Sequence, residues 1–262
     1  MRKIYLILFV VMLVCMGCEW RLRPNGHAEE LQVSVDRFDR VEALYLTTGD
    51  LAALHQMNTD YPQQTRLLIE NLLQLGHVND SGINARFLMY YQDSTLQRLV
   101  ADVESVYTDM TDVDEQLGMA FRQLRNLLPD IEIPHVYAQI SSLDQSIVVG
   151  DGVLGISLDK YLGEEYPVYN KYGYTERQRA TMTRSNIVPD CLSFYLLSLY
   201  PLPAEQDTVQ AYRYRHMGRI QYVVNQAIGT PFFDNEYVSE AEELMNQHEG
   251  MTFGQLLQDT DR

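Results

Sequence analysis

The spacing of the apolar residues changes along this chain, and these changes limit the possible folds more than any other feature of the sequence. Up to Pro129 the apolar residues recur every three or four positions, as they do on one face of a helix, most clearly over 111–128. Over 134–158 the pattern suits β-strands, and helical spacing then returns. We therefore predict an α+β fold, a single, mostly helical domain with one small sheet.

The predicted sheet has a strand at about 134–140 and a β-hairpin at about 146–158. Gly150, Asp151 and Gly152 connect the two runs of the hairpin, because a short connection of this kind needs backbone conformations that glycine adopts freely. The two strands of a hairpin run antiparallel to each other, so we predict a mostly antiparallel sheet.

The other regular structure is predicted to be helical. Thr175 to Gln178 and Ser239 to Glu242 each match the capping box, in which Ser or Thr precedes Glu or Gln by three positions at a helix start. The predicted helices cover 38–45, 62–75, 84–107, 111–128, 187–200 and 205–228, and the pattern over 84–107 also allows a break near Asp93 and Ser94.

The N-terminus has the pattern of an export signal. Arg2 and Lys3 precede an apolar run of eleven residues, 4–14. At about 1.5 Å per residue this run is too short for a bilayer core of roughly 30 Å, so it indicates a signal peptide and not a membrane-spanning helix.

A cysteine follows the apolar run at the position where bacterial lipoproteins carry their lipid. Gly17 directly before Cys18 resembles the lipobox of bacterial lipoproteins, which implies cleavage after Gly17 and a lipid on Cys18. We therefore predict a lipoprotein signal peptide at 1–17, a tether at 18–30 and a globular domain at 31–262. The alternative is a plain secretory signal with an incidental cysteine.

The charge balance argues against two kinds of partner. The 262 residues include 20 Lys+Arg and 36 Asp+Glu, a formal net charge of −16. Cleavage before Cys18 removes Arg2 and Lys3, which leaves 18 basic residues and a formal charge of −18. Because such a surface repels phosphates, we predict no nucleic-acid binding and a body that stands off an anionic lipid surface.

Motifs for cofactor or metal chemistry are not found in the sequence. Apart from Cys15 and Cys18 beside the predicted cleavage site, it contains no CxxC pattern, and it has no HExxH, EF-hand, Walker or G-x-S-x-G pattern, so we predict no cofactor and no metal. Gly150, Gly152 and Gly155 match G-x-G-x-x-G but connect two β segments instead of opening a helix. Cys191 and His216 lie in apolar surroundings, which favours structural roles for both over a nucleophile or a ligand.

Acidic residues leave an enzymatic alternative open. Asp159 and Asp190 are the first candidates, since two positioned carboxylates can perform acid–base work. Asp151, Glu164 and Glu165 lie in the same region of the sequence. The structural alternative is that these side chains shape a turn, remain in solvent or charge a helix N-terminus.

One segment is rich in tyrosine, which supplies apolar area together with a polar handle. It either forms a binding face or packs over the sheet. The five tyrosines are Tyr161, Tyr166, Tyr169, Tyr172 and Tyr174.

Two short segments carry a family resemblance, and it extends over about 31–228. In these segments the chain resembles the gliding-motility lipoprotein GldB family of Bacteroidetes. The matching residues are Ser157, Leu158, Asp159, Tyr161, Leu162 and Gly163, followed by Val188, Pro189 and Asp190.

The resemblance implies a function without catalysis. It implies a lipoprotein anchored to the inner or outer membrane through Cys18, with a periplasmic domain that acts on envelope proteins of motility or secretion machinery. The family more distantly resembles zincin-like peptidases, but Pro189 and Ser193 stand where such peptidases carry zinc ligands. A ligand-binding lipoprotein for sugars or peptides, and the hydrolase described above, are the alternatives.

Overall fold

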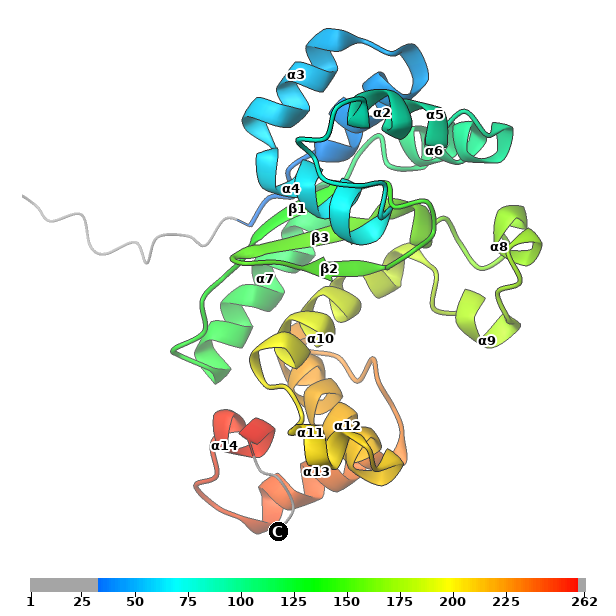
Figure 1. Ribbon diagram of the computed structural model, residues 1–262. Helices are drawn as coiled ribbons and strands as arrows, with labels where there is room; N and C mark the ends of the chain where they lie inside the picture. Colours follow the sequence, from blue (N-terminus) through cyan, green and yellow to red (C-terminus); the bar gives the residue numbers. More distant parts are fainter. Residues whose placement is uncertain (1–32, 259–262) are drawn as a thin grey trace, which may run out of the picture. The chain divides into compact units, whose positions relative to one another are not determined.

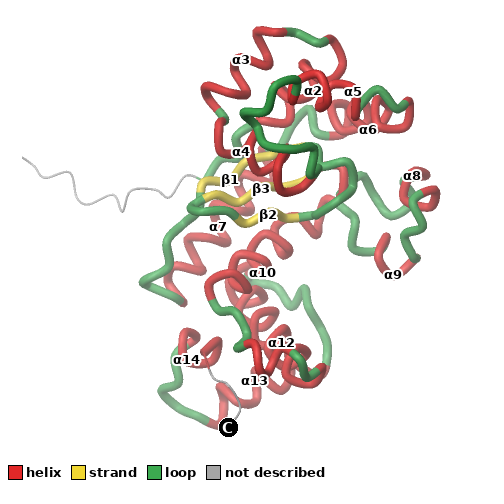
Figure 2. Tube along the Cα trace, in the orientation of Figure 1, coloured by secondary structure: helices red, strands yellow, loops and turns green. Residues whose placement is uncertain are grey.

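A computed structural model describes residues 33–258, apart from the side chain of Glu205. The described residues belong to one compact unit of the chain. In this unit, helices accompany one three-stranded sheet (Figure 1 and Figure 2), so the predicted mostly helical α+β fold is confirmed.

The predicted helices 111–128 and 187–200 are confirmed as α7 and α10, and the capping box at Thr175 opens α9. Before the sheet lie α2 (Phe38–Thr48), α3 (Leu51–Asp60), α4 (Pro62–Arg66), the π-helical η1 (Leu67–Leu72), α5 (Ile83–Tyr90), α6 (Ser94–Val106) and α7 (Thr111–Leu127). After it lie η2 (Leu158–Lys160), α8 (Pro167–Lys171), α9 (Glu176–Arg179), η3 (Arg184–Asn186), α10 (Ile187–Leu199), α11 (Ala204–Asp207), α12 (Gln210–Ile228), α13 (Glu236–Gln247) and α14 (Phe253–Gln258).

The sheet is mixed and not mostly antiparallel, so that part of the prediction is wrong. Its strands are β1 (His135–Gln139), β2 (Ile147–Val149) and β3 (Val153–Ser157), in the order β1-β3-β2. β2 and β3 form the predicted antiparallel hairpin, but β1 pairs with β3 in parallel. The chain leaves β1, crosses to the far edge as β2 and returns between the two as β3, so β3 runs in the direction of β1. All five residues of β3 are buried, as expected for a central strand.

Helices cover the two faces of this sheet, with α2 on one side and α7 and α10 on the other (Figure 1). On the α2 side, Phe38 packs edge-on against Tyr137, with ring centroids 6.2 Å apart. Gly155 pairs with Tyr137 in the register, and a Cβ at Gly155 would lie 2.6 Å from the Tyr137 hydroxyl. The glycine therefore makes room for the tyrosine ring on the central strand.

The C-terminal helices pack around α12, which contacts α7, α10, α13 and α14. Gly218 of α12 lies against Tyr237 of α13, where an added Cβ would come within 2.4 Å of the tyrosine Cβ. The close approach of these two helices therefore requires glycine at this position.

Two predicted helix boundaries are wrong. The helix predicted over 205–228 is divided into α11 and α12 by Val209, which has an extended backbone, because the β-branched pair at 208–209 disfavours helix. The capping box predicted at 239–242 lies inside α13. Asn235 caps that helix instead, since its side chain accepts hydrogen bonds from the backbone N–H groups of Tyr237 and Val238.

Several predicted features of the N-terminus lie outside the described residues. These are the signal peptide at 1–17, the lipidation site Cys18 and the tether at 18–30. Within 33–258, none of the helices combines the length and the apolar character that a membrane crossing requires.

Candidate functional site

The two motif segments, 157–163 and 188–190, meet in the structure. The first includes the end of β3 and η2, and the second lies in the first turn of α10. The hydroxyl of Tyr161 donates a hydrogen bond to Asp190 Oδ2 over 2.8 Å. This bond joins segments that are distant in sequence and gives both residues a structural partner.

Asp159 holds the loop between β1 and β2. Its carboxylate is fully buried and accepts hydrogen bonds from two backbone N–H groups, that of Ser141 at 2.9 Å and that of Leu143. Ser142 and Leu143 have φ values of 57° and 68°, a conformation that non-glycine residues adopt at some cost. The carboxylate stabilises this strained loop by satisfying donors that would otherwise be buried and unpaired.

Two tyrosine hydroxyls form hydrogen bonds with the backbone of the first motif segment. Tyr169 donates to the carbonyl oxygen of Asp159 and accepts from the N–H of Leu162, both over 2.8 Å. Tyr107 donates to the carbonyl oxygen of Tyr161. Because Tyr107 and Tyr169 are fully buried, these bonds are shielded from water and hold the backbone at 159–162 in one position.

The tyrosine-rich segment mostly packs inward. Tyr174 donates to the carbonyl oxygen of Leu143 over 2.7 Å, and Lys160 donates to the Tyr174 hydroxyl over 2.8 Å. Of the five tyrosines, Tyr161 and Tyr169 are buried, Tyr166 and Tyr174 are half-buried, and Tyr172 is exposed. The structure therefore favours inward packing, against the loop after β1, η2 and α6, over a continuous tyrosine binding face.

Burial alters the acid–base behaviour of the motif carboxyls. It raises the pKa of Asp190 to about 6, an effect that the hydrogen bond from Tyr161 opposes by stabilising the charged form. Burial likewise raises the pKa of Asp159, against the effect of its two backbone donors. Both oxygens of Asp159 accept from the loop, and Asp190 Oδ2 accepts from Tyr161, so each carboxyl has a structural partner of its own.

The other candidate side chains, a cysteine, a histidine and a serine, are buried or hydrogen-bonded within the fold. Cys191 is fully buried, and burial raises its pKa well above the usual value, so the unreactive thiol form persists. His216 Nε2 lies 2.8 Å from the carbonyl oxygen of Tyr200, and burial lowers the pKa of its imidazole. Ser193 Oγ donates to the carbonyl oxygen of Pro189 over 2.7 Å, within one helical turn.

The remaining acidic candidates lie at the surface. Asp151 is exposed in the turn between β2 and β3, and Glu164 and Glu165 are exposed next to η2. Across 33–258 there is no group of three or more His, Cys, Asp or Glu side chains arranged to hold a metal ion.

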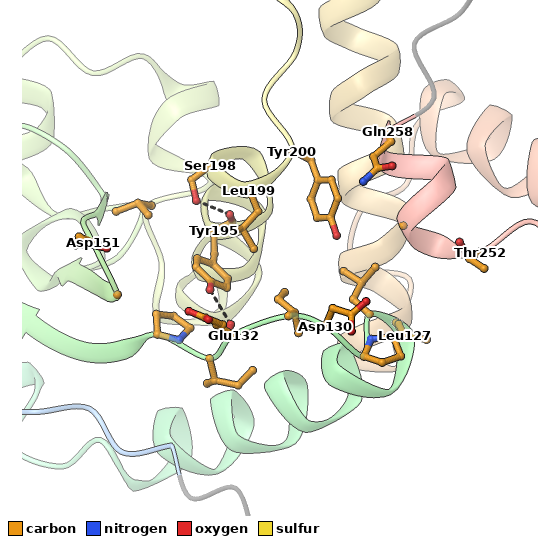
Figure 3. Close-up of a pocket in the computed structure, with 18 of the residues that line it drawn as sticks. Leu127, Asp130, Glu132, Asp151, Tyr195, Ser198, Leu199, Tyr200, Thr252 and Gln258 are labelled. Carbon is orange, nitrogen blue, oxygen red and sulfur yellow. Dashed lines mark hydrogen bonds between the residues drawn. The ribbon is translucent and has the colours of Figure 1, made fainter.

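A groove of about 1010 Å³ opens at the turn end of the hairpin (Figure 3). Its walls come from the loop 127–134, the turn 149–152, the end of α10 and the segment 252–258. Tyr195 donates a hydrogen bond to the carbonyl oxygen of Glu132 over 2.6 Å and thereby ties α10 to the loop. Four distant parts of the chain thus form one concave surface.

Three carboxylates line this groove, and sequence reasoning identified only one of them. Asp130, Glu132 and Asp151 are exposed, and among the described residues that line the groove there is no Lys, Arg or His. Asp130 and Glu132 lie between Pro129 and Pro134, a stretch without periodicity. That irregular stretch was the available signal for a surface loop, but only the fold brings it next to Asp151.

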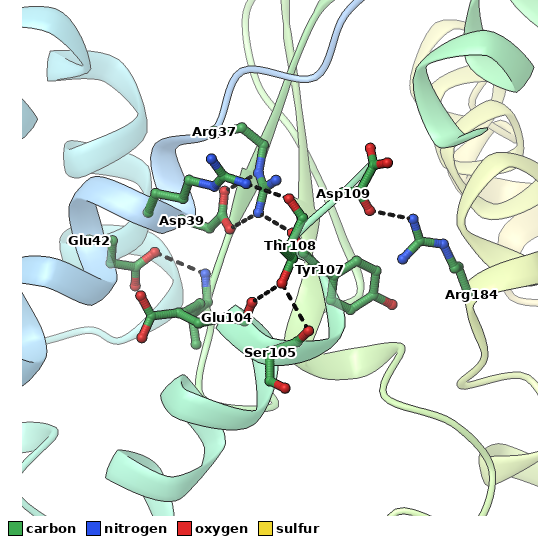
Figure 4. A network of polar contacts seen from close by, with 11 residues as sticks. Arg37, Asp39, Glu42, Glu104, Ser105, Tyr107, Thr108, Asp109 and Arg184 are labelled. Atoms are coloured by element: carbon green, nitrogen blue, oxygen red, sulfur yellow. Dashed lines mark hydrogen bonds and ion pairs between the residues drawn. The ribbon is translucent and has the colours of Figure 1, made fainter. Parts of the chain in front are cut away.

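Sequence reasoning also missed a polar network beneath α2 (Figure 4). Arg37 donates to both carboxylate oxygens of the buried Asp39, over 2.9 and 2.7 Å, and to the carbonyl oxygen of Tyr107. The network therefore reaches the same Tyr107 that holds Tyr161. Asp39 lies on the buried face of α2 together with Glu42 and Leu46, and nothing local in the sequence distinguishes it from a surface acid.

Glu42 lies deeper in the same region. Its Oε2 accepts from the N–H of Ile140 over 2.9 Å, and burial raises its pKa well above the usual value. Three buried atoms of this region have no hydrogen-bond partner in the described part of the chain: Glu42 Oε1, the Tyr137 hydroxyl and Gln139 Oε1. The neutral form of Glu42 suits such surroundings, because it avoids an uncompensated buried charge.

The comparisons identify one family. A family model described as gliding motility protein GldB matches residues 19–260, which extends beyond the range expected from the motif segments. No curated protein and no solved structure matches the chain.

Proposed function

Because the chain belongs to the gliding motility protein GldB family, we propose that it is a lipid-anchored protein of the cell envelope that acts through protein partners and not by catalysis. The family match over residues 19–260 is the observation that carries the proposal. The proposed partners are envelope proteins of the motility or secretion machinery, and the proposed position of the domain is periplasmic.

The anchor is proposed at Cys18. The family match begins at residue 19, directly after this cysteine, which supports a mature chain that starts at Cys18. Acyl chains contribute about 0.8 kcal/mol per buried CH₂, so two or more of them hold a protein firmly at a bilayer.

Fractionation tests the anchor. Cys18→Ser is expected to abolish incorporation of labelled palmitate and to release the protein from membranes. Cys15→Ser is the matched control, since the same change is made three residues earlier, and it should leave both readouts unchanged. Retention of label in the Cys18 variant would contradict the assignment.

The proposed lack of catalysis rests on the motif carboxyls. Asp159 is fully buried and occupied by backbone donors, so it has no access to a substrate. Asp190 is occupied by Tyr161 at 2.8 Å. A general acid or base must reach the proton that it transfers, and the fully buried Asp159 does not, while Tyr161 already occupies one oxygen of Asp190.

A complementation experiment tests the role. A deletion strain is expected to lose spreading on agar, and the wild-type gene should restore it. Crosslinking in living cells, followed by purification, should recover specific envelope proteins. Normal spreading and secretion of the deletion strain, or no specific crosslinked protein, would refute the proposal.

A further inference from the structure

The groove at the hairpin turn is a mixed apolar and acidic surface. The apolar part of its lining includes Leu127, Pro129, Ile133, Val149 and Leu199. Leu199 retains 44% exposure, a high value for a leucine at the end of a buried helix. Such a wall offers apolar area to a partner without rearrangement of the domain.

The carboxylates of the groove have no counter-ion in the described part of the chain. Asp130, Glu132 and Asp151 form no ion pair within residues 33–258, although they share one concave surface. Low-dielectric walls around charges of one sign concentrate their field and attract opposite charge. The groove therefore selects for positive charge flanked by apolar groups.

The same charge argues against other occupants. A second copy of the chain has a formal net charge of −16 and would bring more negative charge to an acidic surface. Nucleic acids and anionic lipid headgroups are repelled for the same reason. The volume of about 1010 Å³ is at the upper end of the range for small-molecule sites, which fits several residues of a peptide better than a single metabolite.

We propose that this groove binds a basic peptide segment of a partner protein, in which Lys or Arg alternates with apolar residues. The inference rests on the proposed function, since it assumes that the protein acts through protein partners. It assigns the contact to the groove and the recognition to the three carboxylates and the apolar wall.

Peptide binding to the full-length lipoprotein in detergent tests the groove. The probe is a fluorescent heptapeptide of alternating lysine and leucine, and the control probe replaces lysine with glutamate. We expect the lysine probe to bind, with an affinity that falls as salt screens the carboxylates, and the glutamate probe not to bind. Equal binding of the two probes would overturn the proposal.

Neutralised variants locate the binding surface. Combined Asp130→Asn, Glu132→Gln and Asp151→Asn should weaken binding of the lysine probe about tenfold or more. The matched control neutralises three exposed carboxylates elsewhere, by Glu115→Gln, Glu164→Gln and Glu165→Gln. Equal loss in the two variants would show non-specific attraction to an acidic protein and would refute the assignment.

Crosslinking in cells separates this inference from the proposed function. A photo-crosslinking residue at Leu199 should capture an envelope protein, while the same residue at Leu51, an exposed leucine of α3, should not capture that protein. If the deletion strain spreads normally, the proposed function fails. If it loses spreading but the groove variant restores it fully and Leu199 captures nothing, the groove assignment alone fails.

Discussion

Removal of the Tyr161 hydroxyl tests the contact between the two motif segments. Tyr161→Phe keeps the buried ring and deletes the O–H that donates to Asp190 Oδ2 over 2.8 Å. A hydrogen bond to a charged acceptor contributes about 1.5–3 kcal/mol and a neutral bond about 0.5–1.5 kcal/mol. The substitution should therefore lower the free energy of unfolding by about 2 kcal/mol when Asp190 is charged and by about 1 kcal/mol when it is protonated.

The pH at which this change occurs follows from the pKa of Asp190. Burial raises that pKa from 3.8 to about 6, so the folded chain binds the proton more tightly than the unfolded chain. The stabilisation is complete below about pH 4 and is lost as the pH rises through about 6. The whole pKa difference between the folded and the unfolded chain corresponds to about 3 kcal/mol of unfolding free energy. Since Asp190 keeps some solvent contact, we expect the free energy of unfolding to fall by about 2 kcal/mol.

A double-mutant cycle separates the two effects. Asp190→Asn retains an oxygen that accepts from Tyr161 and removes the ionisation, so this variant should not lose stability between about pH 4 and pH 8 through this group. In the Asn background, Tyr161→Phe should cost the same at both pH values. Urea unfolding of the full chain, followed by circular dichroism, measures all four proteins. A pH-independent cost of Tyr161→Phe beside a native Asp190 would refute the reasoning.

Three further substitutions test other parts of the structure. Asp159→Asn turns an amide N–H₂ toward a backbone donor of the loop and should cost about 2–4 kcal/mol in urea unfolding, and an unchanged midpoint would contradict the role of Asp159 in the loop. Gly155→Ala places a Cβ 2.6 Å from the Tyr137 hydroxyl and should lower the thermal midpoint, with a cost of about 1–3 kcal/mol. Glu42→Gln removes a carboxyl whose pKa is raised by burial, so the variant should keep at neutral pH the part of the stability that protonated Glu42 gives the native chain only in acid. A native pH dependence in that variant would show that Glu42 is not the titrating group.

Local sequence signals were sufficient for most of the helices and for the hairpin. The helix α7 ends at Leu127, one residue before the predicted end at 128, and Pro129 follows. The glycines of the 150–152 turn lie where the hairpin reverses. These signals are reliable because proline, glycine and apolar spacing act on the backbone over a few residues. The division at Val209 was missed because the low helix preference of two residues is a weak signal beside the strong helical spacing of the apolar residues around them.

The parallel pairing of β1 with β3 was missed for a different reason. A hairpin predicts its own two strands but does not say on which side the third strand joins. Burial decides this point, because β3 is apolar or small throughout and becomes the central strand, with Gly155 under Tyr137. The alternative strand order, with β1 paired to β2, would leave the buried strand β3 at an edge of the sheet.

The candidate site shows the same limit. The motif segments were found from the residues of this chain, but their roles were not. Asp159 holds a loop and Asp190 pairs with Tyr161, whereas the sequence left open an acid–base pair or structural roles in a turn, in solvent or at a helix N-terminus. Asp130 and Glu132 were not candidates, since nothing local distinguishes them from other surface acids.

By itself, the sequence determined the fold class, most of the helices, the family and the acidic character, and it predicts the lipid anchor at Cys18. Only the tertiary structure decided that β3 is central, that Tyr161 meets Asp190, and that three carboxylates share a groove. The physical reason is the separation along the sequence over which each kind of interaction acts. Backbone preferences and composition act within a few residues, while these contacts join segments whose proximity depends on how the whole core packs.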